Sequence, residues 1–298
     1  MTIVRDSYEA FTSMDVALRS IFVSELEVPD DLAQFFNVAQ SNDATEDHHG
    51  DSGVSDVQEY KGKIEYGTSE PLWGKTYTHK EYALGLSIER KLIDDDKWAI
   101  INRKTRSFGM SFARNIARAR ASVFNNAFNG AVAGPDGVAL CSEEHDYSPT
   151  NGTHQSNYQA LALSHANVVT VREAMMELKD PLGNEFPVVP DTLLAPVGLS
   201  EEAFVITQSE AKSGTANNDA NSQRGLRVVV SPYLTDSNAW FLIDSRMAQM
   251  YLNWYWRVQP EFLVDPASQF DLVWRYRGYM RYSFGFDDYR WIYGCNPS

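Results

Sequence analysis

Apolar and polar residues alternate most regularly near the carboxyl end of the chain. Between residues 270 and 287 the even positions are apolar or aromatic, apart from Gly278, and most odd positions are polar or charged. Such alternation predicts a strand with one buried face. At about 3.3 Å per residue the stretch would span roughly 60 Å, whereas strands usually have about five or six residues. The pattern therefore predicts an unusually long strand, even if Gly278 bends it.

A second alternating pattern covers residues 57–90. Apolar side chains share one face at 60, 64 and 66, and again at the even positions from 82 to 88. This predicts a long hairpin of half-buried strands with its tip at 67–74. An isolated two-stranded ribbon is marginally stable in water. We therefore expect the hairpin to lean on another surface, such as a neighbouring subunit.

The spacing changes to three, four and seven after three aspartates at 94–96, a residue type that favours a helix start. This predicts a helix from about 94 to 129, which would be a rod of roughly 50 Å. Its apolar stripe comprises Ile101, Phe108, Phe112, Ile116, Ala119 and Val123. A long rod and a long strand together predict an elongated subunit.

Shorter elements fill the rest of the chain. Helices are expected at 167–179 and 201–208, and strands at 138–140, 192–195, 227–230 and 239–243. Residues 6–36 are weakly helical and lack a core of their own. Polar surface loops are expected at 40–56 and 209–224.

Charge is unevenly distributed. The net charge is −14, and residues 1–60 carry most of the acidic excess, whereas residues 97–135 contain basic residues and no acidic ones. The acidic arm and the basic helix could attract one another between subunits, or both could be solvated faces. An acidic chain disfavours tight nucleic-acid binding by the protein as a whole.

Composition indicates a globular protein, with 43% hydrophobic and 22% charged residues. No apolar run is long enough for a membrane helix, and the first residues do not resemble a signal peptide. The two cysteines, Cys141 and Cys295, lie far apart in the sequence, which favours free thiols in a reducing compartment.

Three motifs invite a chemical interpretation. Gly74-Lys75-Thr76 resembles the end of a phosphate-binding loop, but the required earlier glycine is Ser69 and a strand is expected to follow. Cys141, His145, His154 and His165 do not match zinc-ligand spacing. His48-His49 lies in the acidic loop, where solvated side chains are expected. We therefore predict no catalytic, cofactor-binding or metal-binding residues and no cofactor.

Four stretches resemble the tailed-bacteriophage major capsid (head) protein family, and Mu-type head subunits in particular. They are YTHKEYALGLSIERKLIDDD at 77–96, DGVALCSEEH at 136–145, PVVPDTLLAP at 187–196 and RYSFGFDDYR at 281–290. Each stretch is only moderately specific, but their order along the chain matches the family.

The resemblance implies an α+β fold with an N-terminal arm, an extended loop, a spine helix, a peripheral domain and an axial domain. The expected divisions are the arm at 1–54, the hairpin loop at 55–90, the peripheral domain with the spine helix at 91–164, the axial domain at 165–252 and the closing peripheral strand at 253–298. It also implies a non-enzymatic subunit that forms hexamers and pentamers of an icosahedral head around double-stranded DNA.

The implied partners are other copies of the chain, a portal, a separate scaffold protein and, weakly at the inner face, the packaged DNA; no membrane is expected. The subunit would assemble in the host cytoplasm and reside in the virion capsid. Two alternatives are an encapsulin-like compartment shell and a soluble metal-dependent enzyme that uses Cys141 and the histidines.

Overall fold

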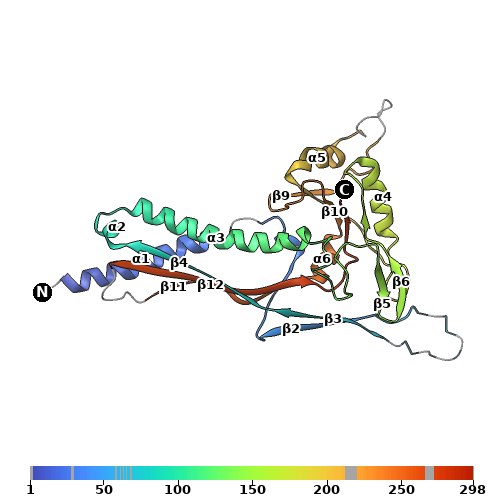
Figure 1. Cartoon of the computed structure of the whole chain (residues 1–298), viewed down its shortest axis with the longest axis horizontal. Helices are drawn as coiled ribbons and strands as arrows, with labels where there is room; N and C mark the ends of the chain where they lie inside the picture. The colour runs from blue at the N-terminus through green and yellow to red at the C-terminus, as the bar shows by residue number, and fades with distance from the viewer. Residues whose placement is uncertain are drawn as a thin grey trace.

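The computed structural model has a long arm and a lobe that stands upright at one end of it (Figure 1). The structure describes every residue except 1–2, 28–29, 58, 61, 63, 65, 68, 212–219, 266–271 and 298, and it describes the side chains from Met14 onward. Within the described residues, each helix is too short or too polar to cross a membrane.

A four-stranded sheet runs along the arm. Its order is β1 (Asn37–Gln40), β11 (Leu252–Val264), β12 (Val273–Phe286) and β4 (Lys80–Glu89). The long strand expected at 270–287 is confirmed as β12, which pairs antiparallel with both β11 and β4. Gly278 does not interrupt its pairing with β4. The rings of Phe108 and Phe112 occupy the space where a side chain would lie, so this position requires a glycine.

The spine helix α3 (Trp98–Asn125) covers the apolar face of this sheet, so the long helix expected at 94–129 is confirmed. A short helix α2 (Arg90–Asp94) precedes it. Helix α1 (Ile3–Leu26) lies beside α3, and the Phe22 ring packs 5.5 Å from that of Phe112, centroid to centroid. The weakly helical amino-terminal segment thus packs Phe22 against the spine helix, whereas Val16 and Val23 remain exposed.

The upright lobe is built on a five-stranded sheet. Its strands, in spatial order, are β7 (Tyr158–Gln159), β13 (Ile292–Cys295), β10 (Trp240–Ile243), β8 (Thr192–Pro196) and β9 (Arg227–Ser231). Every residue of β8, β10 and β13 is buried. The strands expected at 192–195, 227–230 and 239–243 are confirmed.

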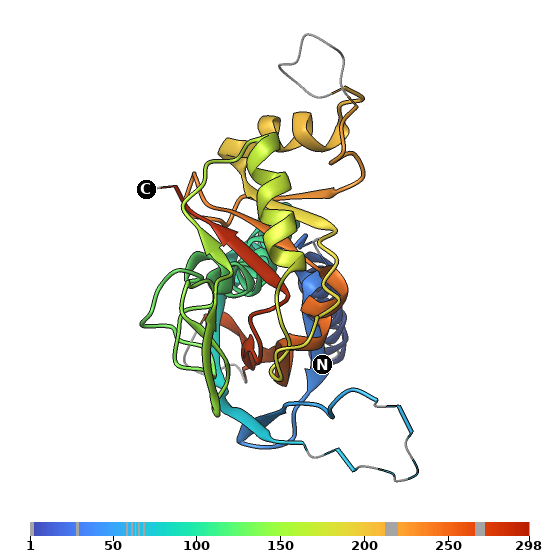
Figure 2. The same cartoon turned by 90° about the vertical axis from the view of Figure 1, so that its right-hand side faces the viewer.

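Short helices complete the lobe and its junction with the arm. They are α4 (His165–Met176), which lies beside β13 (Figure 2), α5 (Ser200–Gln208), α6 (Ser245–Tyr251) and the 3-10 turns Ala33–Phe35 and Val197–Leu199. The Ser164 hydroxyl accepts a hydrogen bond from the Asn167 N–H and caps α4. Both helices expected from the sequence in this region are confirmed.

The hairpin expected within 57–90 is wrong in its pairing. Strand β3 (Pro71–Thr78) pairs antiparallel with β2 (Thr45–Asp51), whereas β4 pairs with β12. The described residues of 52–70 form no strand. The first arm of the ribbon therefore comes from the segment expected to be a polar loop at 40–56, and the described residues of the alternating stretch 57–66 lie at its tip.

One smaller expectation also fails. Residues 138–140 form no strand, and a hairpin of β5 (His145–Ser148) and β6 (Asn151–Gln155) follows them instead. The final strand, β13, joins the five-stranded sheet rather than the sheet of the arm. The chain therefore returns to the lobe after building β11 and β12.

Candidate assembly surfaces

A polar network fixes the base of the β2–β3 ribbon to the arm. The His48 Nδ1 lies 2.9 Å from an Asp287 carboxylate oxygen, and its Nε2 lies 2.7 Å from the Tyr255 hydroxyl. Tyr77 and Asn253 donate further hydrogen bonds to Asp287. Burial and the nearby Asp287 carboxylate raise the pKa of Tyr77, so its phenol remains a donor. The ribbon is therefore anchored at its root.

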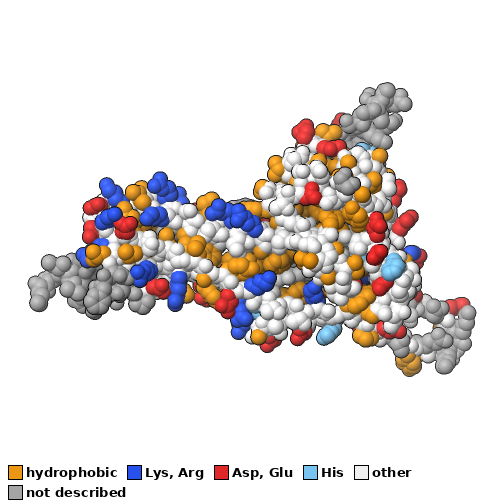
Figure 3. Space-filling view, viewed as in Figure 1, with side chains coloured by type: hydrophobic (Ala, Val, Ile, Leu, Met, Phe, Trp, Pro, Cys, Tyr) orange, Lys and Arg blue, Asp and Glu red, His pale blue; other side chains and the backbone are white. Residues whose placement is uncertain are grey.

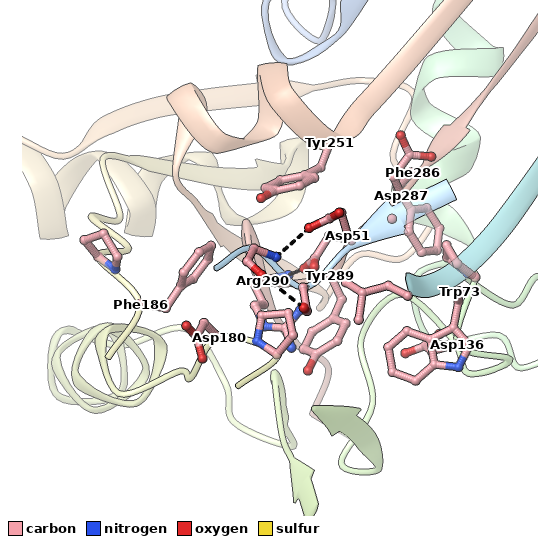
Figure 4. Close-up of a pocket in the computed structure, with 18 of the residues that line it drawn as sticks. Asp51, Trp73, Asp136, Asp180, Phe186, Tyr251, Phe286, Asp287, Tyr289 and Arg290 are labelled. Atoms are coloured by element: carbon pink, nitrogen blue, oxygen red, sulfur yellow. Dashed lines mark hydrogen bonds and ion pairs between the residues drawn. The ribbon is translucent and has the colours of Figure 1, made fainter. Parts of the chain in front are cut away.

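A hollow of about 400 Å³ lies beside this root. Figure 4 shows Trp73 and Asp136 on one side of it and Asp180 and Phe186 on the other. The lining is mostly acidic and aromatic, with Arg290 as the cation. The hollow is thus a crease where the ribbon, two loops and the end of β12 meet.

Each nitrogen of the Arg290 guanidinium donates a hydrogen bond within the protein. It is 1% exposed, and its Nη1 lies 2.6 Å from the Asp288 carboxylate. Its other nitrogens donate to the carbonyl oxygens of Lys179, at 2.7 Å, and Tyr147, at 3.0 Å. A guanidinium satisfied in this way holds the two loops together.

The zinc candidates do not converge on one point. The His145 Nδ1 is paired with Asp136 at 2.5 Å and its ring stacks on Tyr289, whereas the His154 Nδ1 is paired with Asp146 at 2.9 Å. The remaining histidine, His165, contacts Asn221, and burial raises the pKa of the Cys141 thiol. Among the residues that the structure describes, no group of three or more His, Cys, Asp or Glu side chains is placed to hold a metal ion.

The Gly74-Lys75-Thr76 motif lies inside strand β3 rather than in a phosphate-binding loop. The Lys75 ammonium donates to the Ala133 carbonyl at 2.6 Å, and desolvation by burial lowers its pKa. A straight strand cannot wrap its amides around a phosphate. The lysine instead ties the ribbon to the loop after α3.

The tip of the ribbon presents large apolar side chains to solvent. The exposed fractions are 66% for Val54, 100% for Val57, 71% for Tyr60, 66% for Ile64 and 89% for Tyr66. Single apolar residues are common on surfaces, but several large ones exposed on one projecting loop are typical of a protein interaction site. The sequence pattern identified Tyr60, Ile64 and Tyr66 but assigned them to a strand that pairs with 82–88, a pairing that the structure does not have.

Basic side chains gather along the upper edge of the arm, over α2 and α3 (Figure 3). Arg120 forms an ion pair with Asp30 at 2.9 Å, and Arg106 lies 3.8 Å from Glu25. The attraction expected between an acidic arm and a basic helix thus operates within one chain at these two contacts. Further basic residues of α3 remain exposed, namely Arg103, Lys104, Arg114 and Arg118.

The fold is similar to that of subunits in solved phage and GTA capsids and in a virus-like particle. The JBD30 bacteriophage procapsid subunit has a TM-score of 0.58 and 14% identity, with 97% of this chain and 76% of that chain covered. The capsid subunit of a native GTA particle has a TM-score of 0.53 and 17% sequence identity, with 89% of each chain covered. The subunit of a virus-like particle from Pyrococcus furiosus has a TM-score of 0.54 and 9% sequence identity, with 94% of this chain and 98% of that chain covered. No curated protein matches the chain.

A family model described as phage capsid protein matches residues 74–294. The match runs from β3 through both sheets to β13, so it includes the spine helix and the whole upright lobe. The order of elements seen in the fold agrees with it. The chain therefore belongs to the phage capsid protein family and has the fold of a tailed-phage major capsid protein.

Proposed function

We propose that this chain is a structural, non-enzymatic subunit that forms the hexamers and pentamers of an icosahedral head around double-stranded DNA. The observation that carries this proposal is the exposed apolar tip of the β2–β3 ribbon, with Tyr60 and Tyr66 at 71% and 89% exposed. Burying these side chains against a neighbour would be favourable, since apolar surface removed from water contributes about 25 cal/mol per Å².

The five-part division of the chain follows from the same proposal. The arm at 1–54, the loop at 55–90 and the peripheral segments at 91–164 and 253–298 would tile the shell, and the axial domain at 165–252 would approach the capsomer centre. The corrected strand pairing moves the root of the extended loop to β2, which begins at Thr45.

We further propose that the ribbon lies over the spine helix of a neighbouring subunit. The exposed basic residues of α3 would contact acidic segments of adjacent copies, or they would bind the packaged DNA weakly. Exchanging Arg114 and Arg118 for glutamate should lower particle yield at low salt. An unchanged yield would show that these charges are solvated.

The proposed assembly partners are a separate scaffold protein and a portal, and assembly would take place in the host cytoplasm. The family match is to phage capsid proteins, which favours a phage head over an encapsulin-like compartment. Electron microscopy of particles from infected cells separates the two. A phage particle has a tail, a portal and packaged DNA, whereas a compartment is a small sphere filled with cargo enzyme.

Electron microscopy of the purified recombinant protein tests the proposal, with and without co-expressed candidate scaffold protein. Closed shells of uniform curvature, or free hexamers and pentamers, are expected. A monodisperse monomer at high protein concentration in both preparations would contradict it.

A further inference from the structure

Four exposed arginines lie along α3 on the side that faces away from the arm sheet. They are Arg103, Arg106, Arg114 and Arg118, which we call the arginine stripe. At about 100° per residue the four positions fall within a sector of roughly 120°, opposite the buried Phe108 and Phe112. At about 1.5 Å per residue the stripe is roughly 22 Å long. Figure 3 shows basic side chains gathered over this helix.

The stripe places like charges next to one another. Arg103 and Arg106 are three residues apart, and Arg114 and Arg118 are four residues apart. Like charges at these spacings lie on adjacent turns of a helix and destabilise it slightly. Residues 97–135 contain no acidic residue that could offset the repulsion. An anion from another element or another molecule must therefore relieve this cost.

The rest of the described chain supplies little of that anion. Arg106 lies 3.8 Å from Glu25, but its side chain is 66% exposed, so this ion pair is weak. Among the described residues, Arg103, Arg114 and Arg118 form no ion pair. Most of the positive charge of the stripe is therefore available to a ligand.

The surface around the stripe favours a polyanion over a folded protein as the partner. Ser107 and Met110 lie between the arginines, and Met110 is 46% exposed. A protein interface usually has an apolar centre that is depleted in charge, and one methionine does not supply such a centre. Phosphate groups require only positive charge and hydrogen-bond donors, and a guanidinium offers both in a planar fork.

Duplex DNA matches the stripe in length and charge. A duplex carries one phosphate charge per about 1.7 Å of its axis, so a length of roughly 22 Å carries about 13 phosphates. Each guanidinium then has a phosphate within reach. Phosphate contacts position a protein on the duplex but carry no sequence information, so the expected binding is independent of sequence.

The net charge of −14 does not prevent this contact. At 0.1 M salt, exposed charges more than about 10 Å apart are largely screened from one another. A phosphate at the stripe therefore interacts mainly with the arginines themselves. Repulsion from the acidic parts of the chain keeps the contact of one subunit weak, and the many copies in a shell would hold DNA through the sum of such contacts.

We propose that the arginine stripe of α3 is the surface through which each subunit contacts the phosphate backbone of the packaged double-stranded DNA. The inference rests on the proposed shell function, and it selects DNA from the two partners proposed for the basic residues of α3. The side of α3 that carries the stripe would then face the interior of the particle.

The salt dependence of DNA binding tests the proposal. Fluorescence anisotropy measures the binding of a labelled duplex of mixed sequence to unassembled subunits. Four phosphate contacts predict a slope of about −3.6 for log K against log salt, which is a loss of about 150-fold between roughly 50 and 200 mM salt. Arg114→Gln with Arg118→Gln should halve the slope, so that the loss falls to about 12-fold. Equal slopes for the two proteins would overturn the proposal.

The charge-matched control carries Arg224→Gln and Arg246→Gln, at two exposed positions outside α3. Both double variants remove two positive charges, so an effect of net charge alone would be the same in both. The control should keep the wild-type slope, and a loss of slope as large as that of the stripe variant would overturn the proposal. Glutamine favours helices, and circular dichroism checks that each variant is folded.

Two further measurements separate the alternatives. Polyglutamate should displace the labelled duplex less effectively than unlabelled duplex does at equal charge, and the reverse order would favour an acidic protein segment over DNA. Wild-type protein that forms particles under the electron microscope, but whose subunits do not bind the duplex, would refute this inference and leave the shell function intact. A wild-type protein that forms no particles would refute the shell function itself.

Discussion

The five-stranded sheet and the β2–β3 ribbon differ in how completely one chain buries them. Every residue of β10 is buried, whereas along β2 exposed residues alternate with half-buried ones. Beyond β2 the tip carries Val57 at 100% exposed. The first region completes its hydrophobic core inside one molecule, and the second presents apolar surface that a partner must cover. Folding and assembly therefore depend on different residues.

The largest effect on stability is expected in the lobe. Trp240 is fully buried in β10, and its indole N–H donates to the Leu161 carbonyl at 2.9 Å. Trp240→Ala should lower the free energy of unfolding by about 3–5 kcal/mol, because it leaves a cavity and an unpaired carbonyl. Phe204→Ala, at a residue that is 60% exposed in the same lobe, should cost less than about 1 kcal/mol. Urea denaturation measures the free energy of unfolding of both variants. Equal losses would show that burial does not decide the cost of these two substitutions.

The next effect concerns the link between the amino-terminal segment and the spine helix. Arg120 and Asp30 have side chains only 12% and 14% exposed, and the guanidinium also lies 4.9 Å from the Trp254 ring centroid. Arg120→Ala should lower the free energy of unfolding by about 3 kcal/mol, since it leaves a carboxylate buried without its partner. Arg106→Ala, at a 66% exposed side chain, should cost below about 1 kcal/mol. A small loss at Arg120 would mean that this segment is held by neighbours rather than by its own chain.

A moderate and pH-dependent effect is expected at His79, where β3 meets β4. Its ring is 5% exposed and lies between the hydroxyls of Ser41 and Ser283. Burial, with Arg281 and Arg257 nearby, lowers its pKa in the folded state despite the opposing effect of Glu46. The unfolded chain then takes up a proton at a higher pH than the folded chain does. The contribution of the neutral His79 ring to stability is therefore fully present above a pH of about 6.5. It is lost as the pH falls towards the lower pKa of the folded state.

Denaturation at a series of pH values, with His79→Gln as the comparison, measures this effect. The loss for the native chain should be at most about 1.4 kcal/mol per pH unit from this one group. The variant should show a shallower slope below a pH of about 6.5. Identical slopes would mean that the His79 ring contributes nothing to the pH dependence.

The smallest effect on stability is expected at the tip, where the effect on assembly is nevertheless large. Replacing Val57, Tyr60 and Tyr66 together with serine should change the free energy of unfolding by no more than about 0.5 kcal/mol, because the side chains are exposed. Particle yield should be lost. Tyr60→Phe with Tyr66→Phe, which keeps the rings, should assemble. Sedimentation separates particles from subunits. Normal assembly of the serine variant would show that the apolar tip is not required for assembly.

The sequence pattern predicted the parts of the fold whose periodicity is set by burial within the chain. The alternation around Tyr276 and Tyr282 gave β12, and the stripe containing Phe108 and Phe112 gave α3, because each of these side chains packs into the core. The short strands of the lobe were found for the same reason. Strand β11 was not predicted from the sequence.

The pairing of the ribbon could not be predicted from local pattern. The sequence of β2, TEDHHGD, has no apolar residue and is typical of a loop. It forms a strand because β3 pairs with it and because His48 contacts Asp287, which is 239 positions away in the chain. The described residues of 57–66 show the opposite case, in which a strand pattern is present and no strand forms. We attribute that pattern to a contact between subunits.

Hydrogen–deuterium exchange of unassembled subunits and of assembled particles tests the central claim most directly. We expect the backbone amides of residues 54–66 to exchange rapidly in subunits and to become protected in particles, whereas those of β8 and β10 are protected in both. Rapid exchange of the tip in intact particles, or its full protection in the isolated subunit, would contradict the claim that one chain leaves its burial to be completed by another.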